Sequence, residues 1–195
     1  MGTIVVTEFV SLDGIVEDPG GGGDYKHANW TADFDGGVEF DRLKLAELNA
    51  ADAQLLGRVT YDGFAAAWPT IEDEVGFAEK MNGMPKYVVS KTLREPTWHN
   101  TMVLSGDPVK EITALRDTFE RDILVHGSSQ LVHLLAENDL VDSYHLMVYP
   151  VLLGEGRRLF PDAGLAVPTR FRATTVKHVV DLLWIVLDRD RSADV

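Results

Sequence analysis

The apolar residues of this chain fall into short blocks that are separated by polar or glycine-containing turns. The first block, Thr3–Val10, is rich in β-branched residues and ends before Asp13-Gly14, a pattern typical of a buried strand. Similar blocks predict strands at residues 53–56, 86–90, 101–105, 122–126 and 144–151. A last pair of strands is expected within residues 171–188, with residues 182–187 as its apolar centre.

Helical periodicity appears between several of these blocks. Residues 38–50 are predicted to form one helix, with modest periodicity. Asp107-Pro108 marks the start of another, because aspartate caps a helix and proline suits its first position. Apolar residues then recur at helical spacing: Val109, Ile112, Leu115 and Phe119. A third helix is expected after Ser129, with Leu131, Leu134 and Leu135 on its apolar face.

Strands and helices therefore alternate along the whole chain, and no repeat or composition break divides it. The length of 195 residues suits one domain. The long apolar runs are typical of parallel strands that are covered on both faces. We expect a single α/β domain over residues 1–195, with a mostly parallel central sheet, flanking helices and antiparallel strands near the C-terminus.

Composition excludes several classes of function. The chain has no cysteine, and its 31 acidic against 18 basic residues give a net charge of -13. Disulfides and thiolate metal sites are thus absent, and nucleic acid is not an expected partner. The histidines show no metal-ligand spacing, so no metal is expected. No apolar run is long enough to cross a bilayer and the first residues lead directly into a strand, so we expect a cytoplasmic protein without a membrane partner.

The charge is unevenly distributed. Residues 1–79 hold 16 acidic and only 4 basic side chains, and one of those four is Arg58, directly after a predicted strand. A ligand with several phosphates must therefore be attracted locally, by a few cations in an acidic chain.

Three predicted strands end in residues suited to phosphate. Ligands of open α/β sheets bind at the carboxyl ends of strands, where glycine allows close approach and helix N-termini offer free N–H groups. Each such turn is common alone, but three together predict a site for a phosphorylated nucleotide. No G-x-G-x-x-G fingerprint follows the first strand. The residues of these strand ends are Gly57, Arg58 and Thr60; Ser90, Lys91 and Thr92; and Gly127, Ser128, Ser129 and Gln130.

Taken in order, the motifs resemble a known family. The chain carries S-L-D-G at residues 11–14, G-R-x-T-Y at 57–61, S-K-T at 90–92, H-G-S at 126–128, L-V-D at 140–142 and P-x-L-L-G-x-G-x-x-L-F at 150–160. This order is similar to the RibD C-terminal domain family, within the dihydrofolate reductase-like superfamily. The likeness runs from about Thr3 to Phe160 and suits a stand-alone member.

The resemblance implies an NADPH-binding reductase. Arg58 and Thr60 would contact cofactor phosphates, and Ser90 and Lys91 would lie near the adenosine 2′-phosphate. Residues 127–130 would bind the pyrophosphate, and the loop with Asp13 would cover the nicotinamide. The substrate would be a small heterocycle, either a riboflavin-biosynthesis pyrimidine such as 5-amino-6-(5-phosphoribosylamino)uracil or a pterin of the dihydrofolate type.

Two departures from the family pattern concern the substrate side. Riboflavin reductases have a lysine where this chain has Thr7, and Glu-Gly-Gly where it has His126-Gly127-Ser128. The resemblance therefore supports the cofactor more firmly than the pyrimidine substrate. A non-catalytic protein that binds a small ligand on the same fold is the alternative.

Five residues are candidates for catalysis or substrate binding, each with a structural alternative. Asp13 is either a proton donor beside the nicotinamide or a turn-forming residue before glycine. His126 either protonates a substrate or is a semi-buried histidine. Trp30, in a Trp-Thr pair that resembles a substrate-side segment of the riboflavin reductases, either stacks on a planar ring or closes the core. Asp33 either binds substrate or caps a helix, and Tyr149 either faces the cleft or packs inside.

Two further features of the sequence concern anion binding and oligomeric state. Arg157-Arg158 either recognises an anionic group or forms an exposed turn. The apolar segment 182–187 is long for a strand near a chain end, and such an edge invites pairing with a second copy. We therefore expect a homodimer.

Overall fold

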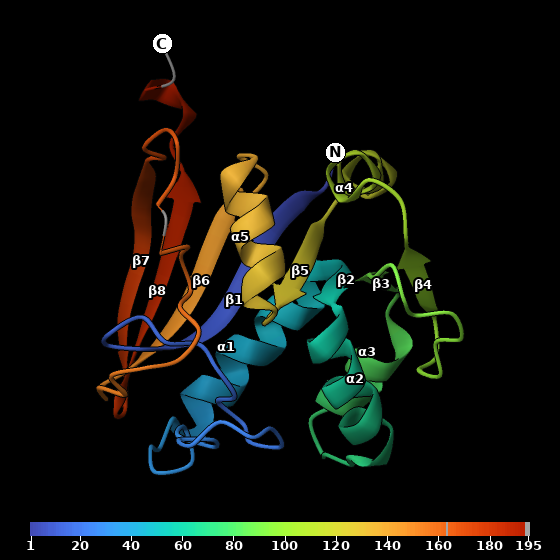
Figure 1. Ribbon diagram of the computed structural model, residues 1–195. Coiled ribbons are helices and arrows are strands. Elements are labelled where there is room, and N and C mark those ends of the chain that lie inside the picture. The colour runs from blue at the N-terminus through green and yellow to red at the C-terminus, as the bar shows by residue number, and fades with distance from the viewer. Residues whose placement is uncertain (163, 194–195) are drawn as a thin grey trace.

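The computed structural model describes residues 1–162 and 164–193, and within them the chain forms one eight-stranded sheet (Figure 1). The strand order across the sheet is β4-β3-β2-β5-β1-β6-β8-β7. The strands are β1 (Thr3–Ser11), β2 (Ala51–Gly57), β3 (Lys86–Val89), β4 (Thr101–Leu104), β5 (Asp122–His126), β6 (Ser143–Tyr149), β7 (Phe171–Val179) and β8 (Leu182–Arg189).

Helices cover both faces of this sheet, which gives a three-layered molecule (Figure 1). Helices α4 and α5 pack on one face, and α1, α2 and α3 pack on the other. Their bounds are α1 (Gly37–Ala50), α2 (Arg58–Ala67), α3 (Phe77–Gly83), α4 (Pro108–Thr118) and α5 (Ser129–Glu137), with short 3-10 turns at η1 (Trp68–Thr70) and η2 (Arg191–Ala193). In the part of the chain described, no helix is long and apolar enough to span a membrane.

The strand directions confirm the expected fold class. Strand β1 runs parallel to both β5 and β6, and β2 runs parallel to β3 and β5. Strand β8 is antiparallel to β6 and β7. The sheet is thus mostly parallel, and its antiparallel part lies in the C-terminal strands.

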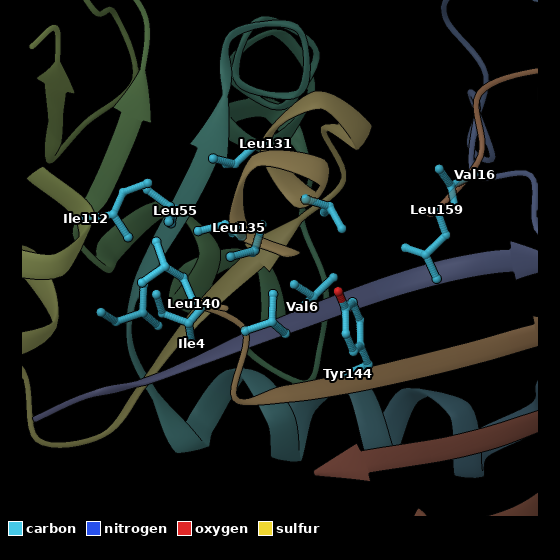
Figure 2. Packing of buried hydrophobic residues seen from close by; sticks show 14 of the residues in the cluster. Ile4, Val6, Val16, Leu55, Ile112, Leu131, Leu135, Leu140, Tyr144 and Leu159 are labelled. Atoms are coloured by element: carbon cyan, nitrogen blue, oxygen red, sulfur yellow. The ribbon is translucent and has the colours of Figure 1, made fainter. Parts of the chain in front are cut away.

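The apolar run of β1 is explained by its central place. Alternate residues of the strand face the two helical layers, so Ile4 and Val6 pack toward α5 while Val5 packs toward α1. Figure 2 shows Leu131 and Leu135 of α5 in the same cluster as Ile4 and Val6. Because both faces are covered, an amphipathic strand would not suit this position.

The structure differs from the sequence-based expectation at four places. Residues after Gly57 do not form a turn but continue as helix α2, and α3 was not expected at all. Strand β6 ends at Tyr149, because Pro150 lacks the N–H that a further ladder bond needs. Residues 182–187 lie in β8, which pairs with β6 on one side and β7 on the other, so they are not an open edge. The stated reason for a homodimer therefore disappears, and the dimer stays a prediction for light scattering to test.

Candidate functional site

A cavity of about 210 Å³ lies at the carboxyl edge of the sheet, where β2, β3 and β5 end. Five of the ten predicted cofactor residues line it, namely Gly57, Arg58, Ser128, Ser129 and Gln130. A larger hollow of about 520 Å³ lies near the start of β2, beside Ala51 and Asp52, and none of the predicted site residues line it. The chemistry suited to phosphate is therefore gathered in the smaller cavity.

The ends of β2 and β5 are locked together by Ser128. Its Oγ accepts the N–H of Gly57 at 3.0 Å and lies 2.7 Å from Thr60 Oγ1. A Cβ at position 57 would come 2.4 Å from this Oγ, so the close approach requires glycine. Gly127 has a φ of +58°, and a Cβ there would meet Thr60 Oγ1 at 2.9 Å. The G-R-x-T motif (residues 57–60) and the H-G-S motif (residues 126–128) thus pack against each other as one unit, the turn assembly.

Two helix N-termini meet at this assembly. Helix α2 starts after Gly57 and α5 starts after Ser128; neither is capped by a side chain, and neither has an acidic residue in its first turn. Helix α4 differs, because the Asp107 carboxylate accepts the N–H of Lys110. The donor groups at the start of α2 and α5 suit an anion, since uncapped N–H groups and the helix dipole both favour negative charge.

Arg58 and the end of β3 form the outer part of the site. The Arg58 guanidinium lies 3.5 Å from Thr92 Oγ1, while its Nε contacts both carboxylate oxygens of Asp62 at 2.8 Å. The Ser90 hydroxyl accepts the N–H groups of Thr92 and Leu93, so it shapes the turn and is itself buried. Lys91 is exposed next to it. The S-K-T strand end therefore lies beside the G-R-x-T helix start.

Asp13 has the contacts of a structural carboxylate. It accepts hydrogen bonds from Ser11 Oγ at 2.6 Å, from Gly154 N–H at 2.7 Å and from Leu153 N–H at 3.2 Å. Desolvation works to raise the pKa of Asp13, but these hydrogen bonds outweigh it and lower the pKa to about 2. An ionised carboxylate does not suit the proton-donor role expected for Asp13, and the turn-forming alternative fits better.

His126 is also unsuited to giving a proton. Its ring packs against Phe64 of α2, and its Nε2 is buried without a hydrogen-bond partner among the described residues. Burial and the nearby Lys44 ammonium lower the pKa of His126 to about 4. The imidazole is therefore neutral at pH 7, and the expected role as a general acid is not supported by its surroundings.

The substrate candidates lie in different environments. Trp30 is buried, donates its indole N–H to the Glu17 carbonyl at 2.8 Å and packs edge-on against Tyr149. Tyr149 is also buried, which raises its pKa to about 12. These two residues belong to one aromatic cluster, so the core-closing alternative describes them in this structure. Asp33 is exposed before α1, where the carboxylate of the neighbouring Asp35 accepts the N–H of Gly37.

A buried polar cluster under α1 was not expected from the sequence. Lys44 Nζ lies 2.5 Å from Glu47 Oε2 and 2.6 Å from Thr7 Oγ1, and His145 Nδ1 lies 2.6 Å from the other Glu47 oxygen. Burial alone would raise the pKa of Glu47, but Lys44 and the His145 hydrogen bond bring it to about 2. Helix α1 thus supplies an ammonium beside Thr7. In the sequence, the signal for this buried cluster was the i,i+3 pair Lys44 and Glu47, which lies on the same side of the helix as the buried Leu48.

Among the described residues, no group of three or more histidines and carboxylates is placed to hold a metal ion. The polar groups of the candidate site are therefore backbone N–H groups, hydroxyls and the Arg58 guanidinium.

Comparison with known proteins shows the family and the fold. The chain is 28% identical over 162 residues to the uncharacterized protein YyaP of Bacillus subtilis (strain 168), which covers 82% of this chain and 80% of that protein. A putative riboflavin biosynthesis protein from Shewanella sp. PV-4 has a similar structure, with a TM-score of 0.77 at 22% identity over 97% of this chain and 99% of that one. Dihydrofolate reductase from Enterococcus faecalis, solved with NADP(H), gives a TM-score of 0.56 at 15% identity and 96% coverage of both chains.

These structural likenesses show the dihydrofolate reductase-like fold. The family model of the RibD C-terminal domain matches residues 2–182, which is nearly the whole chain. This protein belongs to the RibD C-terminal domain family.

Proposed function

We propose that this protein is an NADPH-dependent reductase of a small heterocyclic substrate. The observation that carries the proposal is the meeting of two uncapped helix N-termini with Arg58 at the carboxyl edge of the sheet. Such a set of donors suits the phosphates of a dinucleotide. The NADP(H)-bound dihydrofolate reductase with the same fold supports the choice of cofactor.

When bound, the cofactor supplies a hydride for a carbonyl or imine carbon of the substrate. The chain's own contribution is to bind the phosphates at Gly57, Thr60 and residues 127–130, and to hold the covering loop in place through Asp13. Positioning and exclusion of water are the effects that such a site provides. Because Asp13 is ionised and His126 is neutral, neither of them is assigned a proton transfer.

We propose a riboflavin-biosynthesis pyrimidine, of the 5-amino-6-(5-phosphoribosylamino)uracil type, or a pterin as the substrate class. The rings of Trp30 and Phe34 lie 5.2 and 5.6 Å from the ring of Tyr149, on the side of the sheet where α1 packs. Because Trp30 and Tyr149 are buried in this cluster, the support for the substrate class comes from the family and from its riboflavin-biosynthesis relatives. Oxidation of NADPH in the presence of a panel of pterins and pyrimidines tests this step, and no turnover with any of them would argue against it.

Titration with NADPH, followed by nicotinamide fluorescence, tests the cofactor directly. We expect saturable binding below millimolar concentration, and its absence would refute the proposed function. Arg58→Ala is expected to weaken NADPH more than NADH, because Arg58 lies beside Thr92 at the strand end assigned to the 2′-phosphate. Arg42→Ala, which removes an exposed arginine on α1, is the control. Equal losses for the two cofactors would remove the assignment of Arg58.

A second candidate function is binding of a small planar ligand without turnover. The ionised state of Asp13 and the neutral, buried state of His126 favour it, since neither expected proton donor is suited to the task. NADPH binding without oxidation by any member of the panel is the expected result for this alternative. Turnover of one substrate would dispose of it.

A further inference from the structure

The cavity contains a second arginine, contributed by a segment far from Arg58 in the sequence. Arg157 lies in the loop after β6 and lines the same cavity as Arg58 and Ser129. This loop packs on α5, because His133 Nε2 contacts the carbonyl oxygen of Arg158 at 3.0 Å. Strand β6 lies across β5 and β1 from β2, so the two arginines approach the start of α5 from opposite sides.

The backbone of Arg157 is fixed, while its side chain is held by a weak contact. Its N–H donates to Glu17 Oε2 at 2.9 Å, and its carbonyl accepts the N–H of Val16 at 2.9 Å. The guanidinium Nε lies 3.3 Å from Glu17 Oε1, and more than half of the side chain is exposed. An exposed ion pair of this kind contributes little, so a phosphate that offers several oxygens can replace the carboxylate.

Arg58 shows the same arrangement on the other side of the cavity, where it is paired with Asp62. Each of these two guanidinium groups is thus paired with a nearby carboxylate, Asp62 for Arg58 and Glu17 for Arg157. Arg58 lies toward Thr92 and the end of β3, whereas Arg157 lines the cavity together with residues of α5. The two cations are therefore placed to meet different phosphate groups of one ligand.

We propose that Arg157 is a second phosphate-binding arginine. Its guanidinium breaks the ion pair with Glu17 and binds the bridging diphosphate of a nicotinamide dinucleotide instead. The proposal rests on the proposed function and adds to it a specific role for the loop after β6. It predicts opposite effects for the two partners of the ion pair. Loss of Arg157 weakens the cofactor, whereas loss of the Glu17 charge frees the arginine and strengthens the cofactor.

The test compares Kd values for NADPH and NADH in four proteins: wild type, R157Q, E17Q and the double variant. R157Q is expected to raise Kd roughly 10-fold for both cofactors equally, because both contain the diphosphate. E17Q is expected to lower Kd severalfold, and this gain should vanish when R157Q is also present. R42Q is the matched control, since it removes the same charge from an exposed pair on α1.

Three results would overturn the proposal. The first is R157Q binding as tightly as R42Q. The second is a gain from E17Q that persists in the double variant, which would reveal a general charge effect. The third is E17Q with unchanged affinity, and it decides the matter even if R157Q does not fold. A wild-type protein that binds no NADPH refutes the proposed function itself, whereas normal wild-type binding with an unaffected R157Q refutes only the role of Arg157.

Discussion

Glu8 is a carboxyl group in the middle of the core, and its replacement by glutamine should stabilise the protein in a pH-dependent way. The residue lies on β1 and is 5% exposed, and its Oε1 has no hydrogen-bond partner within the described residues. Burial raises the pKa of Glu8 to about 8, although Lys44 and a hydrogen bond from the Gly127 N–H work in the other direction. Glutamine retains an oxygen that accepts this N–H and never becomes charged.

The size of the effect follows from the two pKa values. In the unfolded chain the group titrates near 4.5, so between pH 4.5 and 8 the folded protein holds a proton that the unfolded chain releases. The stability of the wild type therefore falls as pH rises through this window. One pKa unit corresponds to about 1.4 kcal/mol, so the cost of Glu8 reaches roughly 3 kcal/mol at pH 7 and nearly 5 kcal/mol above pH 8.

Urea denaturation between pH 5 and pH 9 measures this difference. At pH 5 the free energy of unfolding of E8Q should be only slightly higher than that of the wild type. The difference should grow by several kcal/mol up to pH 8 and then level off. Glu120, an exposed carboxyl after α4, provides the control E120Q, which should follow the wild type throughout. Parallel stability profiles for E8Q and the wild type would refute the reasoning that Glu8 is protonated in the folded protein at neutral pH.

Two further predictions concern the core and the turn assembly. E47Q should lower the free energy of unfolding by about 3 to 5 kcal/mol, because it leaves the buried Lys44 ammonium without its carboxylate; a loss below 1 kcal/mol in urea denaturation would contradict this. G57A should displace Ser128, cost about 1 to 3 kcal/mol and abolish NADPH binding in the fluorescence titration. G63A adds a methyl group to open space on α2 and should bind NADPH normally; equal binding by both variants would count against the turn geometry.

The clustering of the candidate cofactor residues at one edge of the sheet could be predicted because it depends on short local patterns. Gly57-Arg58, Ser90 and Gly127-Ser128 each follow an apolar block, and parallel strands bring their carboxyl ends to one edge whatever their order in the sheet. The sequence could not show that Ser128 Oγ joins the two turns, because this contact depends on the pairing of β2 with β5.

Helix α2 was missed because tertiary contacts, more than local propensity, stabilise it. Val59, Thr60 and Gly63 are weak helix formers. Tyr61 compensates, since it is almost fully buried and its hydroxyl accepts the backbone N–H groups of residues 97 and 98. No pattern within the helix itself reveals these partners.

The protonation states of Asp13 and His126 could not be predicted for a similar reason. Of the donors that keep Asp13 ionised, Ser11 is local, but the N–H groups of residues 153 and 154 come from far along the chain. The low pKa of His126 comes from burial, with the Phe64 ring of α2 packed against it, and from the charge of the Lys44 ammonium on α1. The sequence around a residue indicates that its side chain can titrate. The direction in which its pKa shifts depends on the groups that surround it in the folded protein.

The central place of β1 has a consequence for the order in which the chain can fold. Thr3 pairs with Asp122 and Val5 pairs with Ser143, so the first strand finds neither of its neighbours until most of the chain has left the ribosome. During synthesis this apolar segment must wait unpaired, while β2, β3 and β4 can already associate. Strand β1 thus lies at the centre of the sheet and gains its second neighbour only with β6, so trimming or tagging this terminus affects the centre of the molecule.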